Sequence, residues 1–286
     1  MNYQNINSVK TKILLIKIAG LLSILKRNIF LDKLLDKKII KDMENNLNSA
    51  IKKQMTELIT EDKLFSYLNG NYANEIKRDL ITIDKYINKN ELIDMLLFAG
   101  REGGQNLYNK IYYMINKSIS VSDLEKKEKL QPEFELKNER LIKMLENRAN
   151  YIIDSVDKTT LQNLIDIISK GIAEGKSLGE IQKEIHQSID EISLHRAETI
   201  VRTETTNAVN LVEVELSKEL GLKTHRWVTS NDDRVSDECL ENEAEGWINI
   251  GDEFPGGVTQ PPQHPNCRCF LVADIPDDFD FRNMEI

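Results

Sequence analysis

The apolar residues of this chain follow a helical period over most of its length, and this pattern constrains the fold more than any other feature. Residues 8–60 contain no proline, and their apolar side chains recur every three or four positions. That spacing places them on one face of an α-helix. The face consists of Ile40, Met43, Leu47, Ile51, Met55 and Leu58. We expect it to pack on neighbouring helices; a partner-binding or membrane-surface role is the alternative.

Two further helices are predicted before residue 120, at Glu75–Asn88 and Glu91–Asn116. The glycines of Gly100–Gly104 predict a break within the second of them. These glycines do not form a phosphate-binding loop, because the segment lacks the Lys-Ser/Thr ending and a preceding strand. We therefore expect a helical N-terminal region over residues 1–120.

A polar, charged stretch ends at Pro132 and predicts a linker at residues 121–132. The helical period returns at Asn138 and continues to residue 220. A break at Gly175–Leu178 places Ser177 as an N-cap, the position where a serine side chain accepts a hydrogen bond from the new helix. Gly221 is the residue type usual just past a helix end.

After Gly221 the pattern changes to short β-branched and aromatic runs. Thr224–Thr229, Gly246–Ile250 and Arg268–Ala273 are predicted strands, separated by loops rich in glycine and proline. The fold class we expect is mainly α, with a small β-containing, loop-rich C-terminal module (α+β). The C-terminal domain then spans residues 133–286, with helices over 138–220, the β module over 222–275 and an acidic tail over 276–286.

Charge is distributed unevenly along the chain, whose formal net charge is −9. Residues 1–60 carry 11 Lys and Arg against 5 Asp and Glu, whereas residues 230–286 carry 3 against 14. An acidic module is a poor partner for phosphate backbones, since each phosphate contact needs a cation. The basic N-terminal helices are the candidates for contact with DNA, and a solvated lysine face is the simpler interpretation.

The apolar run at residues 13–25 resembles a signal peptide but departs from one in two ways. Lys17 splits the run, and Lys26-Arg27 occupies the place of a small-residue cleavage site. The run is also too short and too interrupted to span a bilayer. We expect a soluble protein that is not exported and has no membrane partner.

The sulfur and imidazole side chains of the module define a candidate metal site. Cys239, His264, Cys267 and Cys269 are ligand types that Zn²⁺ prefers. Three cysteines are too few for a disulfide scaffold, and one would remain unpaired. The alternatives are buried free thiols without a cofactor, or a disulfide from Cys239 to one of the other two.

An ordered series of motifs in residues 130–275 resembles the C-terminal domain of the phage Mu F-like minor head proteins, also called phage head morphogenesis proteins. The most specific of them is the string from His264 to Cys269. The series comprises Arg202-Thr203-Glu204, Ala208, Asn210, Gly221, Trp227, Asp232-Asp233-Arg234-Val235, Cys239, Gly246, Phe254, Pro261-Pro262 and His264-Pro265-Asn266-Cys267-Arg268-Cys269. Of these, Arg202, Glu204, Trp227, Asp233 and Arg234 are taken as residues of a structural motif. The family often has a second cysteine at the position that Ser236 occupies here, which weakens the zinc site.

The resemblance implies a bacteriophage or prophage minor capsid protein that acts in head assembly. Its implied partners are the portal protein and the capsid or scaffold proteins, and portal contact would influence DNA packaging or ejection. Its implied location is the virion, and the host bacterial cytoplasm during assembly.

The alternative function is a zinc-dependent hydrolase, or a carrier domain related to phage-associated toxins. His264 with a cysteine would form the nucleophile pair, and Arg202, Glu204 and Asp233 would complete the site. Arg202 and Glu204, however, point to different faces of a helix because they are two residues apart. We therefore predict that the chain is not an enzyme and that Arg202 pairs with Glu198 or with the Asp232-Asp233 turn.

Overall fold

The structure is a computed structural model that describes residues 34–35, 37–60, 63, 67, 72–117 and 134–276. The predictions for residues 8–33, for the linker at 121–132 and for residues 277–286 of the acidic tail lie outside the described residues.

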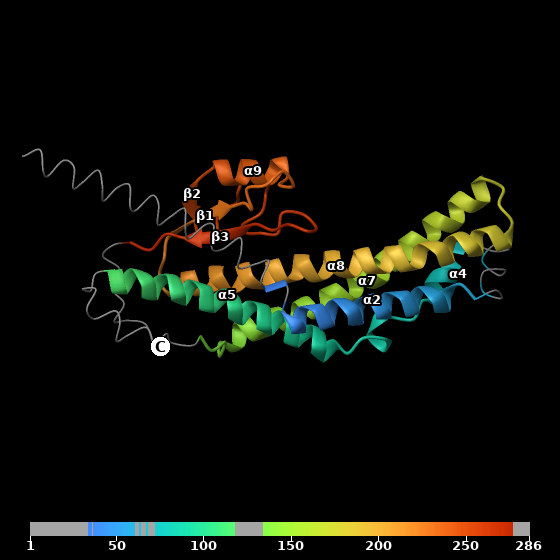
Figure 1. The fold of residues 1–286 in the computed structure, drawn as a ribbon, viewed down its shortest axis with the longest axis horizontal. Coiled ribbons are helices and arrows are strands. Elements are labelled where there is room, and N and C mark those ends of the chain that lie inside the picture. The colour runs from blue at the N-terminus through green and yellow to red at the C-terminus, as the bar shows by residue number, and fades with distance from the viewer. Residues whose placement is uncertain are drawn as a thin grey trace, which may run out of the picture.

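Four long helices form an elongated rod (Figure 1). They are α2 (Lys38–Leu58), α5 (Lys89–Lys117), α7 (Glu139–Ala173) and α8 (Leu178–Glu219). The helices α7 and α8 form an antiparallel hairpin, and α2 and α5 both pack along α8. The helix α8 has 42 residues. At a rise of about 1.5 Å per residue, its length is about 63 Å. It packs against α2, α5, α7 and β3.

The ends of α8 confirm two local predictions. Ser177 and Glu180 form a capping box at its start, a pairing that satisfies backbone N–H groups of the first turn. The Glu180 carboxylate accepts from the Ser177 backbone N–H at 2.7 Å. The helix ends before Gly221, whose φ of 71° lies in the left-handed region. Glycine adopts that region at little cost. Asn138 caps α7 in the same way as a serine would, accepting from the backbone N–H groups of Arg140 and Leu141.

The glycines at 100–104 do not break a helix, and that prediction was wrong. The helix α5 continues through them, because they allow it to lie close to its neighbours. A Cβ at Gly103 would lie 2.6 Å from the Val209 carbonyl oxygen on α8, and one at Gly100 would lie 2.9 Å from a Val212 methyl carbon. A Cβ at Gly104 would overlap the ring of Phe134. Tertiary contact thus outweighs the low helix propensity of glycine.

The single helix predicted over Glu75–Asn88 is also wrong. The helix α4 (Tyr72–Asp79) ends early, and the 3₁₀ turn η1 (Ile83–Lys85) follows. Side chains of other helices hold the intervening backbone: Gln54 of α2 donates to the carbonyl of Ile81 at 2.8 Å, and Asp157 of α7 accepts from the N–H of Ile83 at 2.8 Å. These bonds replace the helical ones.

The C-terminal module is a three-stranded antiparallel sheet with one short helix. Its strands are β1 (Thr224–Val228), β2 (Trp247–Asn249) and β3 (Phe270–Ala273), in the order β2-β1-β3. The strand β3 packs against α8, and the helix α9 (Asp237–Ala244) lies on the far side of the module from α8 (Figure 1). The three predicted strands and the mainly α fold class with a small β module are confirmed, whereas α9 was not anticipated.

A continuous hydrophobic core runs through the rod and reaches the sheet. It includes side chains from Leu34 to Ile275, so α2 and α5 share one core with α7 and α8. A smaller cluster lies between α8 and the module. It consists of Val214, Trp227, Cys239, Phe254, Cys267, Cys269 and Leu271. We call it the module core; all three cysteines of the chain belong to it.

Candidate metal centre and its supporting residues

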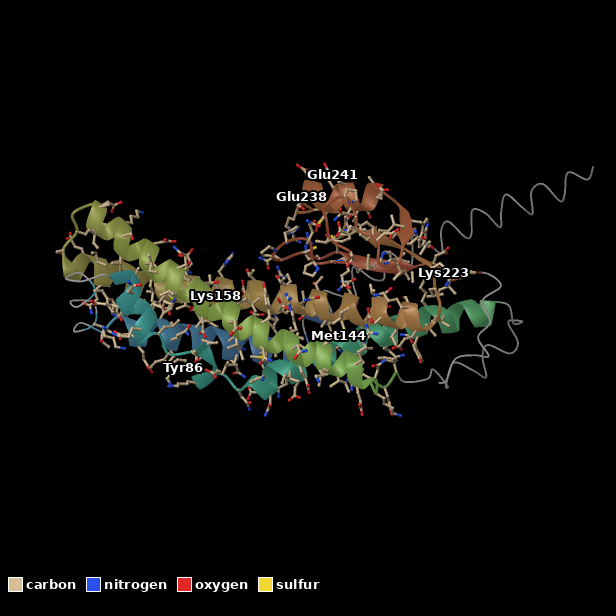
Figure 2. The ribbon with its side chains drawn as sticks, turned by 180° about the vertical axis from the view of Figure 1, so that it is seen from behind. Tyr86, Met144, Lys158, Lys223, Glu238 and Glu241 are labelled. Atoms are coloured by element: carbon tan, nitrogen blue, oxygen red, sulfur yellow. The ribbon has the colours of Figure 1, made fainter. Side chains whose placement is uncertain are left out.

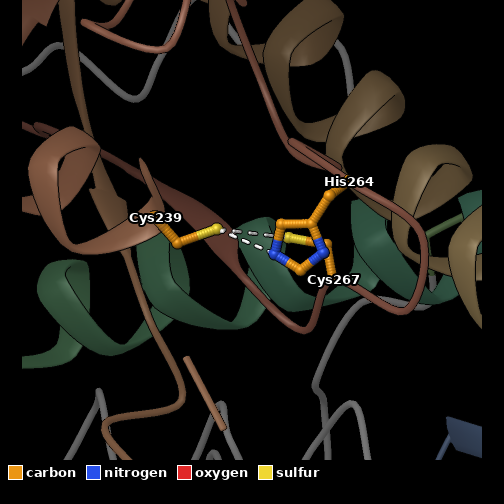
Figure 3. Close-up of side chains that lie close together, drawn as sticks. All are labelled: Cys239, His264 and Cys267. Carbon is orange, nitrogen blue, oxygen red and sulfur yellow. Dashed lines mark hydrogen bonds between the residues drawn. The ribbon is translucent and has the colours of Figure 1, made fainter. Parts of the chain in front are cut away.

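Three of the four predicted ligands, Cys239, His264 and Cys267, come together in the module. The Cys239 sulfur lies 3.4 Å from Nε2 of His264 and 3.8 Å from the Cys267 sulfur. All three potential ligand atoms lie within 4.8 Å of one another. Figure 3 shows the two cysteine sulfurs and the imidazole directed toward one another from α9 on one side and the loop before β3 on the other.

The local sequence explains how α9 presents Cys239. Ser236 is the N-cap of α9, and its side chain accepts from the backbone N–H of Cys239 at 3.3 Å. Asp237 and Glu238 lie in the first turn, where negative charge complements the helix dipole. Ser236 stands where the family often has a cysteine. In this structure its side chain instead positions another cysteine, Cys239. A serine followed by two acidic residues is a helix-start signal that could have revealed α9.

His264 and Cys267 are the first and last residues of a tight turn. The Cys267 backbone N–H donates to the His264 carbonyl at 3.2 Å, and Asn266 adopts a φ of 61° within the turn. A hydrogen bond between the first and fourth residues is typical of such turns. Asparagine tolerates the left-handed conformation better than most residues with a side chain. The turn brings both side chains to the same side as Cys239.

Polar side chains of α8 hold the loop from the side opposite α9. Thr203 accepts from the Asn266 backbone N–H at 2.9 Å, and Thr199 accepts from the Asn266 amide at 3.0 Å. Thr206 donates to the Cys267 carbonyl at 3.0 Å. Asn210, fully buried, donates to the Cys269 carbonyl and accepts from the Leu271 N–H at 2.9 Å. The four α8 residues recur three or four positions apart, so one face of α8 binds the loop.

Cys269 lies next to the three clustered side chains but is not one of the group whose ligand atoms lie within 4.8 Å. Its thiol interacts with the thiols of both Cys239 and Cys267, and these hydrogen bonds together with burial raise the pKa of Cys269. Hydrogen bonds from Cys239 and then from Cys269 lower the pKa of Cys267. Cys267 is thus the sulfur that most favours the thiolate form. All three thiols are free and buried.

The aspartate pair after β1 reaches the same loop through Asp232. Arg268 donates to both Asp232 oxygens at 2.6 Å, and Arg234 reaches Asp232 at 3.3 Å. The Arg268 guanidinium lowers the pKa of Asp232 below its ordinary value, because a bidentate cation stabilises the charged carboxylate. Asp233, the residue named from the sequence, is exposed. The contact with Arg268 of the loop is made by the adjacent residue, Asp232.

The predicted ion pair of Arg202 is wrong. Within the described residues Arg202 has no ion pair, and its Nε is buried without a hydrogen-bond partner. The carboxylates expected to pair with Arg202 do not do so. Glu198 is exposed, and Asp232 binds Arg268. Glu204 is the buried carboxylate here, and it receives two hydrogen bonds from Arg148 of α7, at 2.5 and 2.8 Å. Arg202 and Glu204 therefore do not form a shared site.

Trp227, also named from the sequence, is completely buried at the centre of the module core. Its ring packs edge-on against Phe254 with 5.2 Å between ring centroids. That arrangement is one of those that aromatic pairs prefer. Its position explains its role without any chemistry: it supplies the largest side chain of a small core.

Residues 162–272 match the family model described as Phage Mu protein F like protein. The matched stretch runs from the second half of α7 through α8 and the module into β3, and so contains every site residue discussed above except Arg148. The resemblance inferred from the motifs is confirmed: the chain carries a phage Mu F-like region. Neither the search of curated proteins nor the search of solved structures found a match.

The match supports a phage head morphogenesis protein. It accordingly suggests a non-enzymatic role, a location in the virion and interaction with other components of the phage head. In the described part of the chain, no helix combines the length and apolar character needed to cross a membrane.

Proposed function

We propose that the protein is a minor head protein that acts in phage head assembly through contact with the portal. The observation that carries the proposal is the family match, which covers α8 and the module. Portal contact is the route by which the protein would influence DNA packaging or ejection. It is a protein–protein role, and it needs a rigid body with distinct surfaces rather than a reaction centre.

The described fold supports such a role. The helix α8 forms contacts with α2, α5, α7 and β3, so the module and the rod share one long element. The helices α2 and α9 differ in their exposed charges. Exposed Lys37, Lys38 and Lys53 lie on or next to α2, whereas Glu238 and Glu241 lie on α9, on the side away from α8 (Figure 2). We assign α2 to partner docking and the module to anchoring.

Particle composition tests the head-protein part of the proposal. The chain is expressed with the portal, scaffold and capsid genes of its own phage, and purified proheads and mature particles are examined by quantitative mass spectrometry. Low, reproducible incorporation is the expected result. Absence from both kinds of particle would overturn the proposal.

A binding experiment tests the portal separately. Purified portal is mixed with the full chain, and complex formation is followed by size-exclusion chromatography. The double variant Lys37→Glu, Lys38→Glu is expected to bind more weakly. The matched control Lys158→Glu, Lys170→Glu changes exposed α7 lysines by the same charge and should bind as the unmodified protein does. Incorporation into particles without portal binding would refute the portal contact alone; equal loss in both variants would refute the assignment to α2.

A further inference from the structure

The two distances from the Cys239 sulfur, to His264 and to Cys267, match the edges of a zinc tetrahedron. Zinc binds sulfur at about 2.3 Å and imidazole nitrogen at about 2.0–2.1 Å, so tetrahedral angles separate two sulfurs by about 3.8 Å and sulfur from nitrogen by about 3.6 Å. The observed separations are 3.8 Å and 3.4 Å. The third pair, the Cys267 sulfur and the His264 imidazole, lies within 4.8 Å, so all three atoms are close enough to be drawn to one ion.

The tautomer of His264 is the one that a metal ligand requires. Its Nδ1 lies 2.8 Å from the carbonyl oxygen of Pro265, which has no proton to give, so Nδ1 carries the proton and donates it. Nε2 then presents its lone pair toward the two sulfurs. A backbone carbonyl that accepts from the non-ligating nitrogen is the usual outer partner of a metal-bound histidine.

A fourth donor is available from within the module core. The Cys269 side chain is buried, 3% exposed, and packs in the same module core as Cys239 and Cys267. Three sulfurs and one imidazole form a soft ligand set that favours zinc over magnesium or calcium. Four protein ligands also close the coordination sphere, as in structural rather than catalytic zinc sites.

We propose that Cys239, His264, Cys267 and Cys269 bind one structural Zn²⁺ ion. The ion links α9 to the loop before β3, the two parts of the module that the sheet does not join. On the other side of the loop, Thr199, Thr203, Thr206 and Asn210 fasten the same backbone to α8. The ion thereby completes a connection from α8 to α9 in a module whose own core is small. This site does not depend on portal contact.

Metal analysis of the full chain, purified under reducing conditions, tests the site. The expected result is one zinc per chain by mass spectrometry of the metal. The variants Cys239→Ser, Cys267→Ser and His264→Ala should lower zinc affinity by more than the ~10–100-fold that loss of an outer partner costs. His186→Ala is the matched control and should keep its zinc. Folded protein that takes up no added Zn²⁺, or ligand variants that bind it as well as the control, would overturn the proposal.

Cobalt substitution keeps the test decisive if a ligand variant fails to fold. Co²⁺ bound to the unmodified chain should give the intense visible bands of a tetrahedral site together with thiolate-to-cobalt charge-transfer absorption. That absorption should decrease in Cys269→Ser if Cys269 is the fourth ligand. Weak octahedral bands without charge transfer would overturn the site, and an unchanged spectrum in Cys269→Ser would overturn the fourth ligand.

Discussion

The rod and the module are stabilised in different ways. The rod buries apolar side chains along four long helices, and its closest contacts depend on glycines that admit a neighbouring backbone. The module has a core of only seven residues, three of them cysteines, and depends on polar bonds to α8 and on the Asp232–Arg268 pair. Length accounts for the difference, because a short segment cannot bury enough apolar area to order many loop residues.

The largest effect is expected from removing the centre of the module core. Trp227→Ala should destabilise the module by about 3–5 kcal/mol, the usual cost of truncating a buried aromatic residue. Hydrogen exchange should then show loss of protection in β1 and α9 while α2 and α5 stay protected. Equal loss of protection in the rod would show that the rod and the module unfold as one unit and are not stabilised separately.

A smaller effect is expected where α5 crosses α8. Gly103→Ala places a methyl group 2.6 Å from the Val209 carbonyl oxygen. The helices must then separate, at a cost of about 1–3 kcal/mol. Gly179→Ala is the control, because a Cβ there meets nothing within 4 Å. It should leave stability the same or slightly higher, since alanine has the better helix propensity. Thermal unfolding followed by circular dichroism measures both, and equal melting temperatures would contradict tight α5–α8 packing.

The smallest effect is expected from Asp232, and it depends on pH. Arg268 lowers the pKa of Asp232 in the folded state. The pair therefore stabilises the protein above the unfolded value of about 3.9 and loses this effect as the pH falls further. Asp232→Asn should be less stable than the unmodified chain at pH 6, and the gap should close in strong acid. The control Asp233→Asn removes one negative charge from the adjacent residue and should be as stable as the unmodified chain. Denaturant titrations at both pH values measure the gap, and a gap independent of pH would exclude the ion pair as its cause.

Some site residues could be found from the sequence because their types carry the information. Cys239, His264 and Cys267 are ligand types within one short module, and the structure brings them together. The lack of an ion pair at Arg202 could not be found that way. Helical spacing pointed to Glu198, and the other predicted carboxylate, Asp232, binds Arg268 from a distant loop. The roles of Thr199 and Thr206 were missed for the same reason: threonine on a helix carries no signal until a loop lies against it.

Local order along the chain was determined by the sequence itself. Several features depend only on neighbours within a few positions. They are the period of the apolar residues, Ser177 at a helix start, Gly221 past a helix end and the three β-branched runs. Tertiary structure alone decided the rest. Three features depend on contacts between residues far apart in sequence: α5 continues through its glycines, α4 ends early, and Glu204 pairs with Arg148. No periodicity encodes such contacts, because they exist only once the helices of the rod have packed against one another.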